Sequence, residues 1–98
     1  MTEIIPLKPI PNQAVSVQLG QQNCQINVYQ KATGLYIDLY VDNALIIGGV
    51  IAENKNWIVR SAYLGFVGDL FFLDNQGSDD PDYMGLGGRF SLVYQGTA

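Results

Sequence analysis

Apolar and polar residues alternate with a period of two in several segments of this chain, and no window keeps the i, i+3, i+4 spacing of an amphipathic helix. The alternation is clearest in three segments: AVSVQL (14–19), CQINVY (24–29) and LYIDLYV (35–41). Successive side chains of a β-strand face opposite sides of its sheet, so each segment predicts a strand with one buried face and one face toward solvent or a partner. The sequence therefore predicts an all-β protein.

Turn residues separate the predicted strands at short intervals. Gly20–Asn23 and Lys31–Gly34 are expected to join the first three strands, and Asp42-Asn43 is a candidate two-residue hairpin turn. Further apolar segments follow: LIIGGVI (45–51), WIV (57–59), LFFL (70–73) and RFSLVY (89–94). Short strands with glycine-rich turns predict a single domain over residues 1–98. We expect a small antiparallel β-sandwich or partly closed barrel of about six to seven short strands.

Residues 1–13 are set apart by Pro6, Pro9 and Pro11, which fix φ and remove backbone donors. The segment is expected to run extended along a sheet edge or to reach out as a proline-rich N-terminal arm. Its apolar side chains are candidate interaction residues: Ile4, Ile5, Leu7 and Ile10. We expect the arm to contribute more to assembly than to the stability of the isolated domain. The alternative, that it covers an edge of its own sheet, stays open.

Composition excludes several classes of function. The net charge is −4 with only 5 Lys and Arg residues, so nucleic acid and anionic membranes are not expected partners. The chain has no histidine, which removes the common zinc sites and the Ser-His and Cys-His pairs, and its single Cys24 cannot form an intrachain disulfide. The start MTEIIPLKPIP lacks the apolar run of a secretion signal. No enzymatic activity and no cofactor are expected.

The acidic, glycine-rich stretch 74–88 is predicted to be a long loop. Counting from Asp74, neither the glycine nor the final acid of an EF-hand falls in place. A calcium site made by Asp79, Asp80 and Asp82 remains an alternative, as does turn chemistry alone, which the Asp80-Pro81 pair favours. Asp79 and Asp80 are too close in sequence to flank a sugar as a glycosidase pair. No metal requirement for folding is expected.

Aromatic residues raise a second alternative. Tyr36, Tyr40 and Trp57 could form a platform on which a sugar stacks, although aromatic side chains usually fill or edge a β-sheet. A small carbohydrate- or calcium-binding β module therefore stays open beside a purely structural domain.

Four segments, in this order, resemble one known family: IPLKPIPNQ, GLYIDLY, LGFVGDLFFLDNQGSDDPDY and LGGRFSLVY. The chain is similar to the baseplate plug proteins of contractile-tailed phages, of which the cyanophage members are the clearest examples. The resemblance implies a structural protein of the virion, made in the host cytoplasm and located at the hub end of the tail tube. It implies contacts with baseplate hub, tail tube or spike proteins, and a homo-oligomer or multi-copy arrangement.

The resemblance also implies that Asp74–Tyr83 is the acidic connection between the last two strands, used for shape and contact. Exposed sheet faces and this connection add candidate interaction residues to those of the arm: Tyr36, Tyr40, Asp79, Asp80 and Tyr83.

Overall fold

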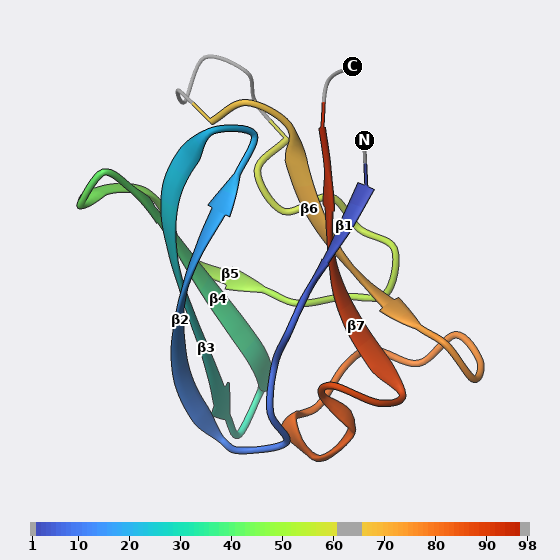
Figure 1. Cartoon of the computed structure of the whole chain (residues 1–98). Coiled ribbons are helices and arrows are strands. Elements are labelled where there is room, and N and C mark those ends of the chain that lie inside the picture. Colours follow the sequence, from blue (N-terminus) through green and yellow to red (C-terminus); the bar gives the residue numbers. More distant parts are fainter. Residues whose placement is uncertain (1, 61–65, 97–98) are drawn as a thin grey trace.

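The computed structural model describes residues 2–60 and 66–96, which form two antiparallel sheets packed face to face without closing into a barrel (Figure 1). The predicted all-β sandwich is therefore confirmed. Within the described residues the elements are β1 (Thr2–Ile5), β2 (Asn12–Leu19), β3 (Gln22–Lys31), β4 (Gly34–Val41), β5 (Ala44–Ile51), β6 (Asp69–Asp74), the 3-10 turn η2 (Tyr83–Gly85) and β7 (Phe90–Gln95).

The larger sheet has the order β2-β3-β4-β5, so each strand pairs with the next one along the chain. Gly20-Gln21 and Asp42-Asn43 connect their strands as two-residue turns, and all four residues have positive φ. This conformation is that of a type I′ turn, whose twist matches that of the flanking strands. The predicted hairpins are confirmed, and the alternating pattern of each strand fixes their register.

The smaller sheet has the order β1-β7-β6, with β7 in the centre. Thr2 lies opposite Gln95 and Ile5 opposite Leu92, so the two ends of the described chain pair with each other. In Figure 1 the start of β1 and the end of β7 consequently lie close together. Long-range pairing of this kind leaves no signal in either strand's own sequence.

The WIV segment (57–59) is not a strand, which corrects the simplest interpretation of its composition. It runs beside β6, where Ile58 N–H donates to the Leu70 carbonyl. The Asp69 carboxylate accepts the next two amides, of Val59 and Arg60, at 2.7 and 2.8 Å. A side chain thus replaces the backbone ladder, and Arg60, with φ of 65°, turns the chain away.

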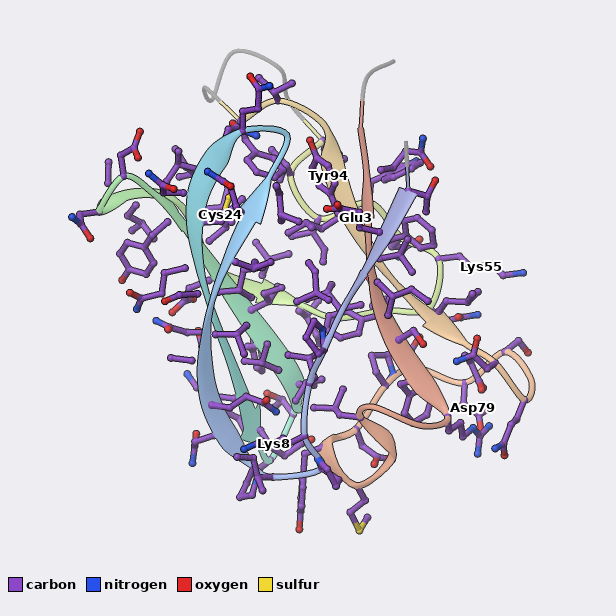
Figure 2. The ribbon with its side chains drawn as sticks, viewed as in Figure 1. Glu3, Lys8, Cys24, Lys55, Asp79 and Tyr94 are labelled. Atoms are coloured by element: carbon purple, nitrogen blue, oxygen red, sulfur yellow. The ribbon has the colours of Figure 1, made fainter. Side chains whose placement is uncertain are left out.

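One hydrophobic core fills the space between the sheets. The larger sheet contributes Leu19, Cys24, Ile26, Val28, Leu35, Ile37 and Leu39, and the smaller sheet contributes Ile5, Leu70, Phe72, Phe90, Leu92 and Tyr94. Nearly all are residues that the alternation predicted to face inward, so the predicted faces are confirmed. Figure 2 shows Tyr94 between the two sheets, while the Lys55 side chain points away from them.

The start of the N-terminal segment runs along its own domain, because β1 forms the edge strand of the smaller sheet beside β7. Ile5 and Leu7 belong to the core, and β2 already begins at Asn12. The reason is positional, because the three prolines all follow β1 and leave its amides free to pair with β7. These contacts argue against an arm that reaches out to a neighbour and contributes little to the stability of the domain.

We therefore expect Ile5→Ala to destabilise the isolated domain by about 2–4 kcal/mol, because it leaves a cavity in the core. Ile4→Ala is the matched control: Ile4 neighbours Ile5 in β1 but is 69% exposed, so its truncation should change stability by roughly 0.5 kcal/mol or less. Urea denaturation of both variants measures the difference. Equal stabilities for Ile5→Ala and the unmutated chain would show that β1 is not part of the folded core.

Candidate functional site

The outer face of the larger sheet carries tyrosines and amides and few charges. We call it the tyrosine face. Across β3 and β4 the rings of Tyr29 and Tyr36 stack with centroids 6.0 Å apart, and the Lys31 ammonium lies 5.4 and 5.3 Å from these two centroids. Tyr40 lies on the same face, opposite Leu45 of β5. Tyrosine enrichment with few charges is the composition found at the centre of protein–protein interfaces.

One carboxylate sits within the tyrosine face. Asp38 of β4 accepts hydrogen bonds on one oxygen, Oδ1, from the Tyr29 hydroxyl at 2.9 Å and from the Gly49 amide at 2.7 Å. Burial raises the pKa of the Tyr29 hydroxyl, and the bond to Asp38 raises it further, so Tyr29 stays a donor at neutral pH. Asp38 is thus engaged within the sheet.

A second surface lies on the outer face of the smaller sheet, and we call it the apolar row. Ile4, Val93 and Phe71 lie opposite one another across β1, β7 and β6. Trp57 extends the row, with its ring edge-on to Phe71 at a centroid distance of 5.1 Å. Ile4 is 69% exposed and Trp57 45%, so two large apolar side chains remain in water. Exposed apolar side chains that gather on one face are a candidate site of association.

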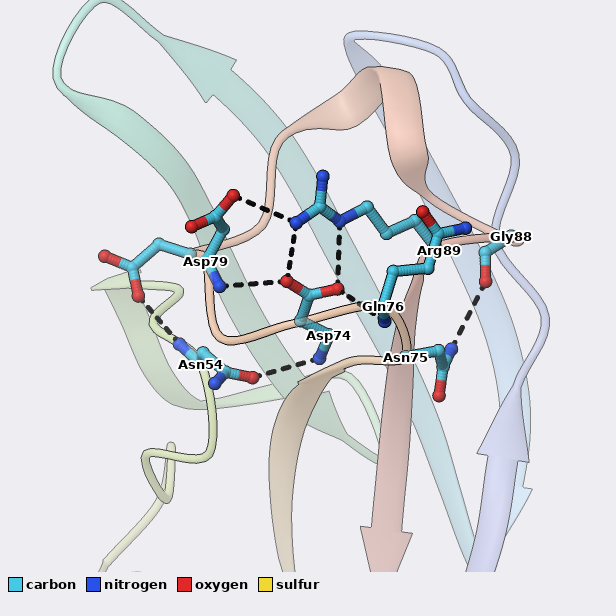
Figure 3. A network of polar contacts seen from close by, with 8 residues as sticks. Asn54, Asp74, Asn75, Gln76, Asp79, Gly88 and Arg89 are labelled. Carbon is cyan, nitrogen blue, oxygen red and sulfur yellow. Dashed lines mark hydrogen bonds and ion pairs between the residues drawn. The ribbon is translucent and has the colours of Figure 1, made fainter.

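The acidic loop is organised by Arg89. The guanidinium binds Asp74 with two hydrogen bonds, Nε to Oδ1 at 2.9 Å and Nη2 to Oδ2 at 2.8 Å, and also contacts Asp79 at 2.9 Å (Figure 3). Asp74 also accepts the amides of Gln76 and Asp79, both at 2.9 Å. Arg89 and these amides hold the pKa of the Asp74 carboxyl well below its usual range, and Asp74 raises the pKa of Arg89.

The remaining loop acids bond to backbone amides. Asp80 accepts the Asn54 amide at 2.9 Å, while the Asn54 side chain accepts the amide of Asp74 at 2.9 Å. Asp82 caps η2 by accepting the Met84 amide at 3.0 Å. Within residues 2–60 and 66–96, no three acidic or cysteine side chains gather closely enough to hold a metal ion. The loop contacts favour turn chemistry over the calcium site.

The predicted interaction residues lie in separate regions. Tyr36 and Tyr40 are on the tyrosine face, and Ile4 is on the apolar row. Ile10, which is 41% exposed, lies in the connection between β1 and β2. Asp79 and Asp80 are engaged in the loop, and Tyr83 packs partly against the core. Ile5 and Leu7 are buried in the core, so their side chains are not exposed for contact with another protein.

The sugar platform is not formed as a unit, because Trp57 lies against Phe71 of the smaller sheet while Tyr36 and Tyr40 belong to the larger one. Arg89 and Asp38 were not among the predicted residues. Arg89 could have been noticed as one of only 5 cations in a chain with 9 acids. The thiol of Cys24 is buried, and burial raises its pKa, which makes it a poor nucleophile.

A family model described as cyanophage baseplate Pam3 plug gp18 matches residues 1–97. The chain belongs to this family. It is thus a structural protein of the phage virion, a plug of the tail baseplate, which argues against an enzyme. No curated protein matches the chain.

The family match confirms the predicted resemblance to the baseplate plug proteins. A plug within a baseplate contacts other baseplate or tail proteins, so the surfaces described above are where such contacts should be sought. Within the part of the chain that the structure describes, no helix is long and apolar enough to cross a membrane.

We expect Asp74→Asn to lower the thermal midpoint by about 10 °C or more, because Arg89 then loses its buried charged partner. The loss should depend on pH. The folded-state pKa of Asp74 is depressed, so its stabilisation is complete above about pH 5 and is lost as the pH falls below the ordinary aspartate pKa of ~4. Denaturation of both chains from pH 7 to pH 2 should therefore show their stabilities converging in acid. Asp79→Asn, whose side chain is 74% exposed, is the control with a small effect.

We also expect calcium to leave the thermal midpoint unchanged, because the loop acids are already bonded to Arg89 and to backbone amides. A functional calcium site at a hundredfold excess of ion over Kd would add about 2.7 kcal/mol. Melting curves with calcium and with EDTA test this. A midpoint that rises with calcium and falls back with EDTA would restore the calcium site.

Proposed function

We propose that this chain is a non-catalytic plug at the hub end of the tail tube, present in several copies and held there by protein–protein contacts. The observation that supports this is the pairing of two exposed surfaces with few charges, on opposite sheets of a baseplate protein. The tyrosine face offers large polar aromatic groups, and the apolar row offers Ile4 and Trp57.

The two surfaces suit different neighbours. The outer faces of a sandwich point in opposite directions, so one copy can contact two neighbours at once. Such bivalent contact suits a protein that closes a channel, because each copy is fixed on both sides. We propose the hub, tube or spike proteins as these neighbours, with further copies of the chain around the axis.

Charge is consistent with this arrangement. The chain carries −4, while most of the polar groups on the tyrosine face are uncharged. Binding at that face therefore removes few ions from water, which keeps the cost of desolvation low.

The test is binding to the purified hub, tube and spike proteins of the same phage, measured by calorimetry. We expect at least one of them to bind, and Tyr40→Ala or Ile4→Asp to weaken that binding by about tenfold or more, as loss of an interface anchor does. Met84→Ala is the matched control, because Met84 is 70% exposed but lies in η2, away from both surfaces.

Binding that both variants leave unchanged would show that neither surface is the contact. No binding to any of the three proteins would contradict the position at the hub end. Light scattering of the chain alone and in the complex gives the number of copies.

A further inference from the structure

The strand β5 is an edge strand with unusual composition. Within the described residues it pairs only with β4, on one side. Residues 43–52 contain no charged residue and no proline, and Leu45 and Ile51 are 57% and 41% exposed. A long apolar edge is a template to which another strand can add, and natural proteins block such edges with charges, prolines or bulges. Only the last of these devices is present in β5.

The pairing of β4 with β5 is interrupted twice. Ile37 lies opposite Val50 and Leu39 opposite Ile47, so Gly48 and Gly49 together oppose the single residue Asp38. This two-to-one match is a β-bulge, which bends a strand and increases its twist. Ile46 is then the extra residue of a second irregularity, between Ile47 and Leu45.

Asp38 holds the first bulge from the side. Gly49 has φ of 66°, a left-handed conformation, and its amide donates to the Asp38 carboxylate at 2.7 Å. The amide is therefore bonded within the sheet. Tyr29 fixes the carboxylate in turn, because its hydroxyl donates to the same oxygen at 2.9 Å while its ring stacks on Tyr36.

We propose that Asp38 keeps the β5 edge unpaired. By accepting the Gly49 amide it maintains the bulge, and the bulge prevents β5 of a second copy from pairing with this edge as an antiparallel strand. A second copy is the occupant that the β5 edge fits, because its own residues 44–52 are uncharged and apolar on both strands of the pair. Each chain carries −4, which opposes association in general, but two β5 strands would meet along residues 43–52 without any opposed charge. The inference does not depend on the proposed function, since it concerns the free chain before assembly.

The first test is Asp38→Ala, with Glu3→Gln as the control that loses the same charge from an exposed position on β1. We expect Asp38→Ala to self-associate at concentrations roughly tenfold lower than the unmutated chain or the control, as measured by light scattering. Amide exchange in residues 44–51 should slow on association. An unchanged mass, with unchanged exchange at Gly49, would overturn the proposal.

Two further variants keep the test decisive if Asp38→Ala does not fold. Gly49→Ala disfavours the left-handed conformation, while the added methyl group meets no atom within 4 Å, so the fold should be retained. It should associate in the same way, more weakly. Association of neither variant would overturn the proposal.

Leu45→Lys places a charge on the edge itself. Added to whichever variant associates, it should restore the monomer. If association persists, it occurs elsewhere than at β5, and the proposal is wrong. The proposal is also wrong if the unmutated chain already self-associates and Leu45→Lys alone abolishes that association. It is wrong, too, if the variants bind a strand of a hub protein but not a second copy of the chain.

Discussion

The burial of Tyr94 joins the two sheets into one structure. Its ring lies edge-on to Phe66 at a centroid distance of 5.7 Å, and its hydroxyl donates to the Val67 carbonyl at 2.6 Å. A side chain at Gly20 or at Gly68 would collide with it, so both glycines are needed for this close approach. Gly20 lies in the turn between β2 and β3 of the larger sheet, and Gly68 directly precedes β6 of the smaller one, so Tyr94 contacts both sheets at one end of the core. Its burial also raises the pKa of the phenol, which keeps the hydroxyl protonated as a donor.

The Arg89–Asp74 pair lies at the other end of the smaller sheet. Asp74 ends β6 and Arg89 precedes β7, so the pair closes the connection between two neighbouring strands. The Asn75 amide donates to the Arg89 carbonyl at 2.7 Å beside it. Ordering a loop of this length costs conformational entropy. Hydrogen bonds at both ends of the loop offset that cost. Most of the acidic side chains of the loop bind Arg89 or backbone amides of the domain itself. The outer sheet faces are therefore the broader surfaces for contact with other proteins.

Local patterns predicted the strands, whereas contacts between distant residues decided the rest. Alternation in β2, β3 and β4 was sufficient because burial of one face dictates it directly. No local pattern could pair β1 with β7, or place Trp57 against Phe71 and away from Tyr36. The bulge in β5 did leave a sign, since two glycines inside an apolar strand often mark one. The exposed face of the sheet predicts the tyrosines as contact residues, whereas the bond from the Gly49 amide to Asp38 depends on the register of β4 and β5 and leaves no local sign.

The order of the strands along the chain has a consequence for synthesis. All pairings of the larger sheet are between neighbours, so its hairpins can form as soon as β5 has left the ribosome. The smaller sheet cannot, because Thr2 must wait for Gln95, 93 residues later. Until β7 emerges, the apolar inner face of the four-stranded sheet and the side chain of Ile5 have no cover. A nascent chain in this state exposes apolar surface, and unfinished chains with such surface are prone to aggregate.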